Sequence, residues 1–115
     1  MSILNGKQRI SAERQRQIEA EGWTPEHDDE HGSSTLEHAA HCYVEADDEQ
    51  ASPPKLWPWD RAWWKPKNKI RNLERAGALY LAAAEAAERA NDLETRDRLR
   101  DQVESCAIRI DSLFT

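Results

Sequence analysis

Tryptophans and basic residues alternate over residues 57–71, WPWDRAWWKPKNKIR. An indole face stacks on flat rings and attracts cations, while lysine and arginine bind phosphate, so this mixture is typical of a site for a nucleotide-like ligand. The candidate aromatic wall comprises Trp57, Trp59 and Trp63, with Lys67 and Arg71 as candidate phosphate ligands. A structural alternative stays open, because tryptophans in small domains are usually buried and the lysines beside them are usually solvated.

The histidines form a second cluster that has the spacing of metal ligands. All four fall between residues 27 and 41, at helical intervals: His27, His31, His38 and His41. Imidazoles on one helix face, with acidic neighbours, are ligands for zinc or another divalent ion. The spacing matches neither H-E-x-x-H nor a CxxC pair, so we expect no metal and no other cofactor. A metal site made of these histidines, within a metal-dependent nucleotide hydrolase, is the weaker alternative.

Motifs for covalent or phosphoryl chemistry are missing from the sequence. It has no G-x-S-x-G turn, P-loop or glycine-rich dinucleotide turn, and it contains 4 glycines. Glu85 and Glu88 have the E-x-x-E spacing that all-helical nucleotide pyrophosphatases use for magnesium, which is thin support for such an enzyme. We therefore expect a binding protein without catalytic residues.

Charge divides the chain into two zones. Residues 26–49 hold nine acidic and no basic residues, whereas residues 55–75 hold seven basic residues against Asp60 and Glu74. The zones either face each other in the fold and neutralise one another, or leave an acidic face for a protein partner. The net charge of −6 makes nucleic acid an unlikely partner.

Length and composition indicate one small soluble domain over residues 1–115. No apolar run approaches the roughly 20 residues of a membrane span, and the N-terminal segment does not have the pattern of a signal peptide. Cys42 and Cys106 are expected to be free thiols. These features predict a cytoplasmic protein that does not bind membranes.

The N-terminal half has the local signals of helices. Residues 7–21 predict a helix that ends at Gly22, and Thr24 followed by proline predicts the cap of the next one. Gly32 should interrupt that helix, and a capping box that begins at Ser34 should restart it.

Four prolines predict a loop over residues 49–68 with one short turn near Asp60. Helical spacing returns over residues 68–114, with a break at Asn91, which indicates an antiparallel hairpin. Its second helix has a heptad seam: Leu99, Val103, Cys106, Ile110 and Leu113. The seam is expected to pack within the chain, although a homo-oligomer through residues 92–114 is an alternative. Together these elements predict an all-α fold.

Two segments resemble the ryanodine receptor repeat (RyR) domain. One is Gly22-Trp23 followed by Asp28-Asp29, and the other is Pro58-Trp59 followed by Trp63, Lys67 and Arg71. On this resemblance, residues 7–66 form the RyR-like N-terminal part. The strings EGWTPEHDDEH and WPWDRAWWKP also resemble a group of short phage and prophage proteins. Residues 32–56 are longer and more acidic than the family pattern, and the helix beyond Asn91 lies outside its core.

The RyR resemblance implies a helical module with a pocket between its G-W turn and its P-W segment. The ligand site predicted from both arguments comprises Trp23, Asp28, Asp29, His31, Trp57, Trp59, Trp63, Lys67 and Arg71. The implied function is that of a phage or prophage accessory protein, in the host cytoplasm, that binds and sequesters a nucleotide-like signal in host-defence conflict. The alternative is an inhibitor or adaptor that binds a host protein through its acidic face or C-terminal helix.

Overall fold

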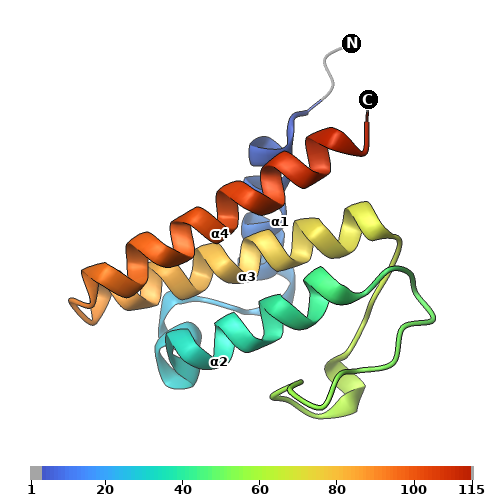
Figure 1. Ribbon diagram of the computed structural model, residues 1–115. Coiled ribbons are helices and arrows are strands. Elements are labelled where there is room, and N and C mark those ends of the chain that lie inside the picture. The colour runs from blue at the N-terminus through green and yellow to red at the C-terminus, as the bar shows by residue number, and fades with distance from the viewer. Residues whose placement is uncertain (1–3, 115) are drawn as a thin grey trace.

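The computed structural model describes residues 4–114, which form four α-helices and one short 3₁₀ turn (Figure 1). The helices are α1 (Gly6–Glu21), α2 (Pro25–Glu45), α3 (Lys69–Arg89) and α4 (Leu93–Ser112), and the 3₁₀ turn is η1 (Arg61–Trp63). No residue from 4 to 114 lies in a β-strand, so the predicted all-α fold is confirmed. None of the helices in this range has the length and apolar character needed to span a membrane.

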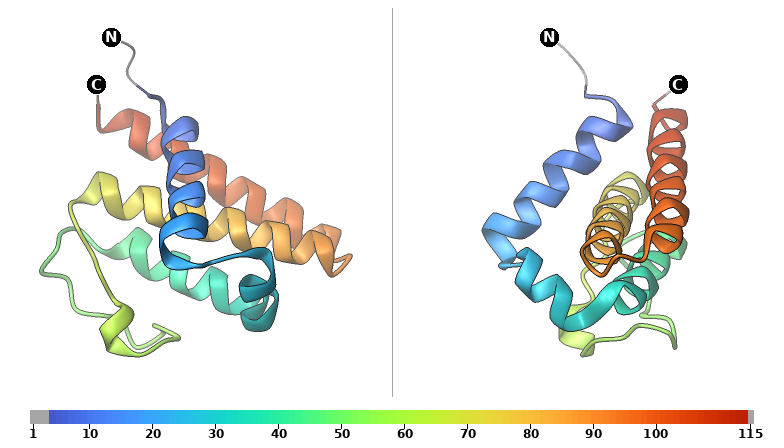
Figure 2. Two further views of the ribbon diagram at one scale, coloured as in Figure 1. Left: turned by 180° about the vertical axis from the view of Figure 1, so that it is seen from behind. Right: turned by 90° about the vertical axis from the view of Figure 1, so that its left-hand side faces the viewer.

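Helix α3 lies at the centre of the fold. It packs between α2 and α4, antiparallel to both, and α1 crosses it on one face of this layer (Figures 1 and 2). The crossing is close because Gly77 has no side chain: a Cβ there would lie 2.5 Å from Cδ1 of Ile10. The start of α1 is joined to the end of α4 by a hydrogen bond from the Gly6 amide to Asp111 Oδ1 (2.7 Å).

The boundaries of α1 and α2 follow the local signals in the sequence. The Asn5 side chain caps α1, and Gly22 ends it in the left-handed conformation, with φ of 72°. The Thr24 hydroxyl then caps α2 by accepting from the His27 amide (3.3 Å). The predicted end of the first helix and start of the second are therefore confirmed.

Helix α2 is kinked at Gly32, where φ is 80° and ψ is 158°. The predicted interruption is confirmed, but the capping box predicted after it is wrong. The Glu37 carboxylate forms a two-point contact with the Arg98 guanidinium of α4 and does not reach back to the Ser34 amide. An ion pair between helices has taken the place of a local cap.

The C-terminal half is the predicted antiparallel hairpin. Asn68 caps α3, Asn91 turns the chain with φ of 61°, and Asp92 caps α4. Along the predicted seam, Leu99, Cys106 and Ile110 are buried, Val103 packs against the core and Leu113 is 50% exposed. The buried part of the seam packs within the chain, as predicted, on the alanine-rich face of α3.

The two charge zones contact each other at the ion pair between Lys69 and Asp47 (3.3 Å). Other acids of the first zone are neutralised from outside the second: Asp28 by Arg14, Asp29 by Arg89 and Glu37 by Arg98. The prediction that the zones face each other therefore holds at one ion pair, and arginines of α1, α3 and α4 provide most of the pairing.

The long loop between α2 and α3 is fixed at both ends by one side chain. Asn72, which is fully buried on α3, donates from Nδ2 to the carbonyls of Ala46 (3.0 Å) and Lys67 (2.9 Å). Its Oδ1 accepts from the Lys67 amide (2.6 Å). Between these points the chain makes the predicted short turn, in which the Asp60 carboxylate caps η1. Asn72 therefore sets where this tryptophan-rich loop leaves and rejoins the helices.

Candidate ligand-binding pocket

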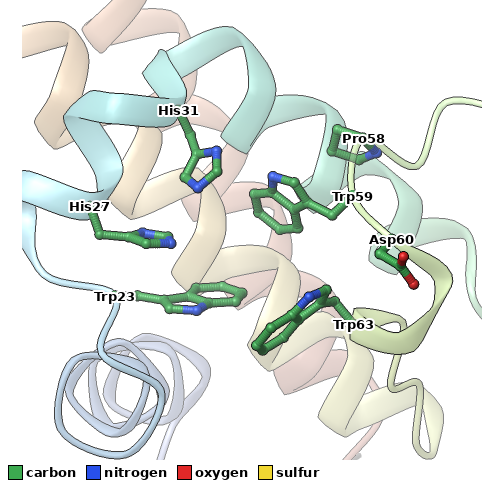
Figure 3. A pocket seen from close by; sticks show the side chains of 7 residues that line it. All are labelled: Trp23, His27, His31, Pro58, Trp59, Asp60 and Trp63. Carbon is green, nitrogen blue, oxygen red and sulfur yellow. The ribbon is translucent and has the colours of Figure 1, made fainter.

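A cavity of about 420 Å³ lies between the α1–α2 turn, the first half of α2 and the tryptophan-rich loop (Figure 3). Three indoles, two imidazoles, one proline and one carboxylate line it: Trp23, Trp59, Trp63, His27, His31, Pro58 and Asp60. The volume is within the range of small-molecule sites, and so is a lining of mostly aromatic surface with a few polar groups.

The helical side of the pocket is a stack of rings. Trp23 directly follows the left-handed Gly22, and its ring lies parallel to that of His27, with centroids 5.8 Å apart and planes 7° apart. His31 follows one turn later on α2, 4.6 Å from His27 between ring centroids. Arg14 holds the turn by donating to the Trp23 carbonyl (3.0 Å).

The loop side of the pocket is supported by an aromatic cluster that reaches the core. Trp59 makes edge contacts with Trp23 (5.5 Å) and His31 (5.4 Å), so it closes the cavity against the helical side. Behind it, Trp57 lies 5.4 Å from Trp59 and 5.6 Å from the buried Tyr43. Such edge-to-face pairs add about 0.5–1.5 kcal/mol each beyond the area they bury, so the wall is well braced.

Trp63 occupies the edge of the pocket. The Asp60 carboxylate caps η1 by accepting from the Ala62 amide (2.9 Å), and this short turn presents Trp63 with 54% of its surface exposed. Burying a large apolar side chain completely stabilises the fold by about 1.5–3 kcal/mol, and the exposed Trp63 gives up part of this stabilisation. Lys65 places its ammonium 5.5 Å from the centroid of this ring.

The polar groups of the pocket are few. Trp59 Nε1 is buried and has no hydrogen-bond acceptor among residues 4–114, and Figure 3 shows it on the side of the indole nearer His31. A buried donor without an acceptor costs about 1–3 kcal/mol of folding free energy. His27 Nδ1 lies 3.3 Å from the Asp28 carboxylate.

The structure brings four of the nine predicted site residues to the pocket: Trp23, His31, Trp59 and Trp63. Trp57 lies behind the wall and does not line the cavity. Asp28 is fully buried in an ion pair with Arg14 (2.6 Å), so it braces the turn from inside. Asp29 pairs with Arg89 (2.8 Å) beside a separate hollow near the α2 kink.

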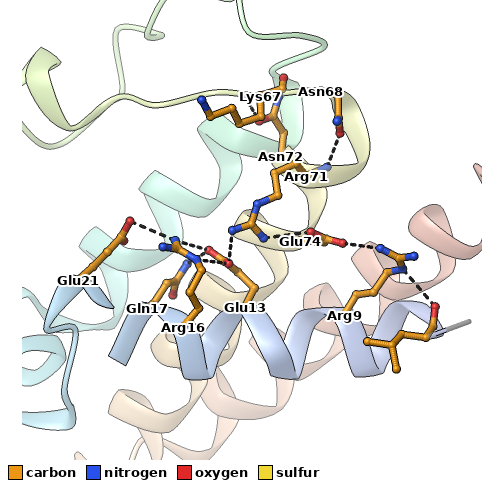
Figure 4. A network of polar contacts seen from close by, with 11 residues as sticks. Arg9, Glu13, Arg16, Gln17, Glu21, Lys67, Asn68, Arg71, Asn72 and Glu74 are labelled. Atoms are coloured by element: carbon orange, nitrogen blue, oxygen red, sulfur yellow. Dashed lines mark hydrogen bonds and ion pairs between the residues drawn. The ribbon is translucent and has the colours of Figure 1, made fainter. Parts of the chain in front are cut away.

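The two predicted phosphate ligands lie elsewhere. The Arg71 guanidinium contacts Glu13 (2.6 Å) and Glu74 (3.0 Å) in a network between α1 and α3 (Figure 4). Burial alone would raise the pKa of the Glu13 carboxyl, but Arg16 and Arg71 hold it below its ordinary value. Lys67 is exposed and is fixed through its backbone to Asn72. Arg71 is thus satisfied by carboxylates of the protein itself.

The sequence reasoning missed three lining residues: His27, Pro58 and Asp60. His27 had a usable signal, because it stands one helical turn before His31. Asp60 also had a usable signal, because the sequence predicts a short turn there and an aspartate side chain commonly accepts from the backbone amide two residues further on. What linked them to the tryptophans was tertiary packing, which no spacing in the sequence reveals.

The alternative metal site is not formed. Within residues 4–114, no three histidine, cysteine or acidic side chains are placed to hold a metal ion together. His38 and His41 are exposed further along α2, where His41 pairs with Glu45 (3.2 Å). Burial raises the pKa of the thiols of Cys42 and Cys106, the latter to about 11, which disfavours the reactive thiolate.

Comparisons with protein-family models, curated proteins and solved structures give no match to this chain. The RyR resemblance is therefore still a prediction, and the arguments that follow start from the pocket.

Proposed function

We propose that this protein binds a nucleotide-like small molecule and holds its flat ring in the pocket. The observation that carries the proposal is the convergence of Trp59 and Trp63, from the loop, and the distant Trp23, from the α1–α2 turn, on one cavity of about 420 Å³. Stacking on aromatic side chains is worth about 1–3 kcal/mol per base, which makes such a lining suited to a nucleobase.

Four lining residues and one residue beside the cavity have roles in this proposal. The exposed Trp63 provides a face for the ring, and Trp59 closes the cavity by its edge contacts with Trp23 and His31. His27 and His31 provide further hydrogen bonds from the helical side. Lys65, beside Trp63, is the basic residue that we assign to a phosphate, in place of Lys67 and Arg71.

We also propose, on the resemblance to phage and prophage proteins, that the biological role is to sequester a signal during host-defence conflict. Sequestration needs binding without turnover, which is the mode of binding that we propose for this pocket.

Thermal shifts against a panel of mononucleotides, dinucleotides and cyclic nucleotides test the proposal. A ligand that binds the folded state alone raises the melting temperature by mass action. The matched variants are Trp63→Ala, which removes an exposed lining indole, and Leu56→Ala, which removes a 62% exposed side chain of the same loop outside the lining. We expect Trp63→Ala to weaken binding by about tenfold or more and Leu56→Ala to leave it unchanged.

An absence of any shift across the panel would contradict the proposal. It would favour the alternative in which the acidic residues or α4 bind a host protein. Binding that Trp63→Ala does not weaken would place the ligand at another site and would also count against it.

A further inference from the structure

We propose that the ring held in this pocket is positively charged: an N-alkylated heteroaromatic cation, such as an alkylated pyridine or purine. The inference rests on the proposed function and specifies its ligand class. It is carried by the charges that line the cavity and by those that lie around it.

The lining carries no fixed positive charge. Its seven residues include one carboxylate, Asp60, and neither lysine nor arginine. Asp60 is exposed, and while its Oδ1 accepts from the Ala62 amide, its second oxygen has no hydrogen bond or ion pair with another residue from 4 to 114. A cationic ring entering the pocket would therefore meet one carboxylate that has no ion-pair partner, together with three indoles, which is a combination that recognises organic cations.

Two arginines on the helical side of the pocket are neutralised, whereas Arg61 of η1, next to Asp60, has no ion pair with a carboxylate among residues 4–114. Arg14, behind Trp23, contacts the carboxylates of Asp28 (2.6 Å) and Glu85 (3.0 Å). Arg89, at the far side of α2, contacts Asp29. These ion pairs remove the groups that would otherwise repel a cation or select an anion at the helical side of the cavity.

Trp63 already takes part in a contact of this kind. The Lys65 ammonium lies 5.5 Å from its ring centroid, within the distance at which the ring quadrupole attracts a cation. Lys65 does not line the cavity, so the interior keeps its negative character. A cation bound inside the cavity would be attracted to the indole rings by the same quadrupole interaction.

A flat cation fits the pocket better than a compact ammonium or a metal ion. The lining is mainly aromatic surface, and the planes of Trp23 and Trp59 meet at 62°, which leaves ring faces rather than converging oxygen atoms. A delocalised alkylated ring is weakly hydrated and loses little on leaving water, whereas a compact ion needs oxygen ligands that this site lacks.

The test compares two pairs of probes that differ by one ring charge: 1-methylnicotinamide with nicotinamide, and 7-methylguanosine with guanosine. Calorimetric titration in slightly acidic buffer, in which 7-methylguanosine keeps its N1 proton and its positive charge, gives the dissociation constants. We expect the charged member of at least one pair to bind about tenfold more tightly than its neutral partner. The pair that responds identifies a pyridine or a purine ring.

A matched pair of variants ties the preference to the pocket. Asp60→Asn removes the charge and keeps an Oδ1 acceptor for the Ala62 amide. Asp48→Asn does the same at a site outside the lining, where Oδ1 accepts from the Gln50 amide (2.8 Å). Asp60→Asn should weaken binding of the charged probe by about threefold or more and leave the neutral probe unchanged, whereas Asp48→Asn should change neither.

Equal affinities within both pairs would overturn the inference, and so would a preference that Asp60→Asn does not reduce. Failure of the inference is distinct from failure of the proposed function. Neutral rings or nucleotides that bind in a Trp63-dependent way would leave the proposed function standing, while an absence of binding by every probe and nucleotide would overturn both.

Discussion

Replacing Asn72 by leucine should release both ends of the tryptophan-rich loop. The amide is fully buried and makes three hydrogen bonds, to the Ala46 carbonyl and to both backbone groups of Lys67, at 2.6–3.0 Å. Leucine has a similar shape but no polar atoms, so all three bonds are lost while packing is largely kept. At about 1 kcal/mol per bond the loss is about 3 kcal/mol, with more if the freed backbone groups stay dry.

The control is another buried amide that is changed in the same way. Gln17 on α1 makes one long side-chain hydrogen bond, to Glu13 (3.3 Å), and its Oε1 has no donor among residues 4–114. Gln17→Leu removes one long hydrogen bond and one unsatisfied buried acceptor, so it should change the free energy of unfolding by less than about 1 kcal/mol. Comparison of the two variants separates the contribution of the three Asn72 hydrogen bonds from the general effect of placing a leucine at a buried amide position.

Urea unfolding followed by tryptophan fluorescence measures both variants. Asn72→Leu should lower the free energy of unfolding by about 3 kcal/mol, which for a domain of this size is roughly 12 °C in melting temperature. It should also weaken ligand binding, because the loop carries Trp59, Asp60 and Trp63. Equal losses for the two variants, or a loss below about 1 kcal/mol for Asn72→Leu, would refute the assignment of Asn72 as the anchor of the loop.

Three further predictions concern the supports of the fold. Asp28→Asn leaves the buried Arg14 without its closest carboxylate and should lower the free energy of unfolding by about 3 kcal/mol in the same assay. An unchanged free energy of unfolding would mean that Glu85 alone neutralises Arg14. Gly77→Ala places a Cβ 2.5 Å from Ile10 and should cost about 1–3 kcal/mol, unless α1 moves away freely, in which case circular dichroism melts would not change. The pKa of Glu13 is lowered in the folded state, so its contribution to stability is present above its ordinary pKa of 4.5 and is lost as the pH falls through the folded value. In Glu13→Gln, the free energy of unfolding should therefore decrease less than in the unmodified protein when unfolding is measured at successively more acidic pH.

The helices could be predicted from the sequence because their ends are encoded locally. Each boundary depends on one residue with a distinct conformational or capping property, such as Thr24, Gly32 or Asn91. The exception at Ser34 is informative: Glu37 has the correct spacing for a capping box, yet Arg98 on α4 binds it. A tertiary ion pair replaced a local hydrogen bond, and Arg98 stands 61 residues away in the sequence.

The aromatic half of the site was predictable and the basic half was not. Indoles in a proline-rich loop must pack against other side chains or a ligand, and the helix end at Gly22 places the Trp23 ring in the turn that follows. Whether a cation is free depends on which carboxylates the fold brings to it. Arg71 meets Glu13 because α1 crosses α3 at Gly77, and that crossing depends on contacts between residues more than 60 positions apart.

The rigidity of the loop explains why its tryptophans can form a binding wall rather than a collapsed cluster. Prolines fix part of its backbone, Asn72 holds its ends, and Trp64 Nε1 donates to the Ala51 carbonyl (2.7 Å) across its middle. Trp57 and Tyr43 then support Trp59 from behind. Because these contacts order the indoles before any ligand arrives, binding loses little conformational entropy. A loop anchored in this way can keep Trp63 at the pocket edge, where an unanchored loop would fold the same indole onto the core.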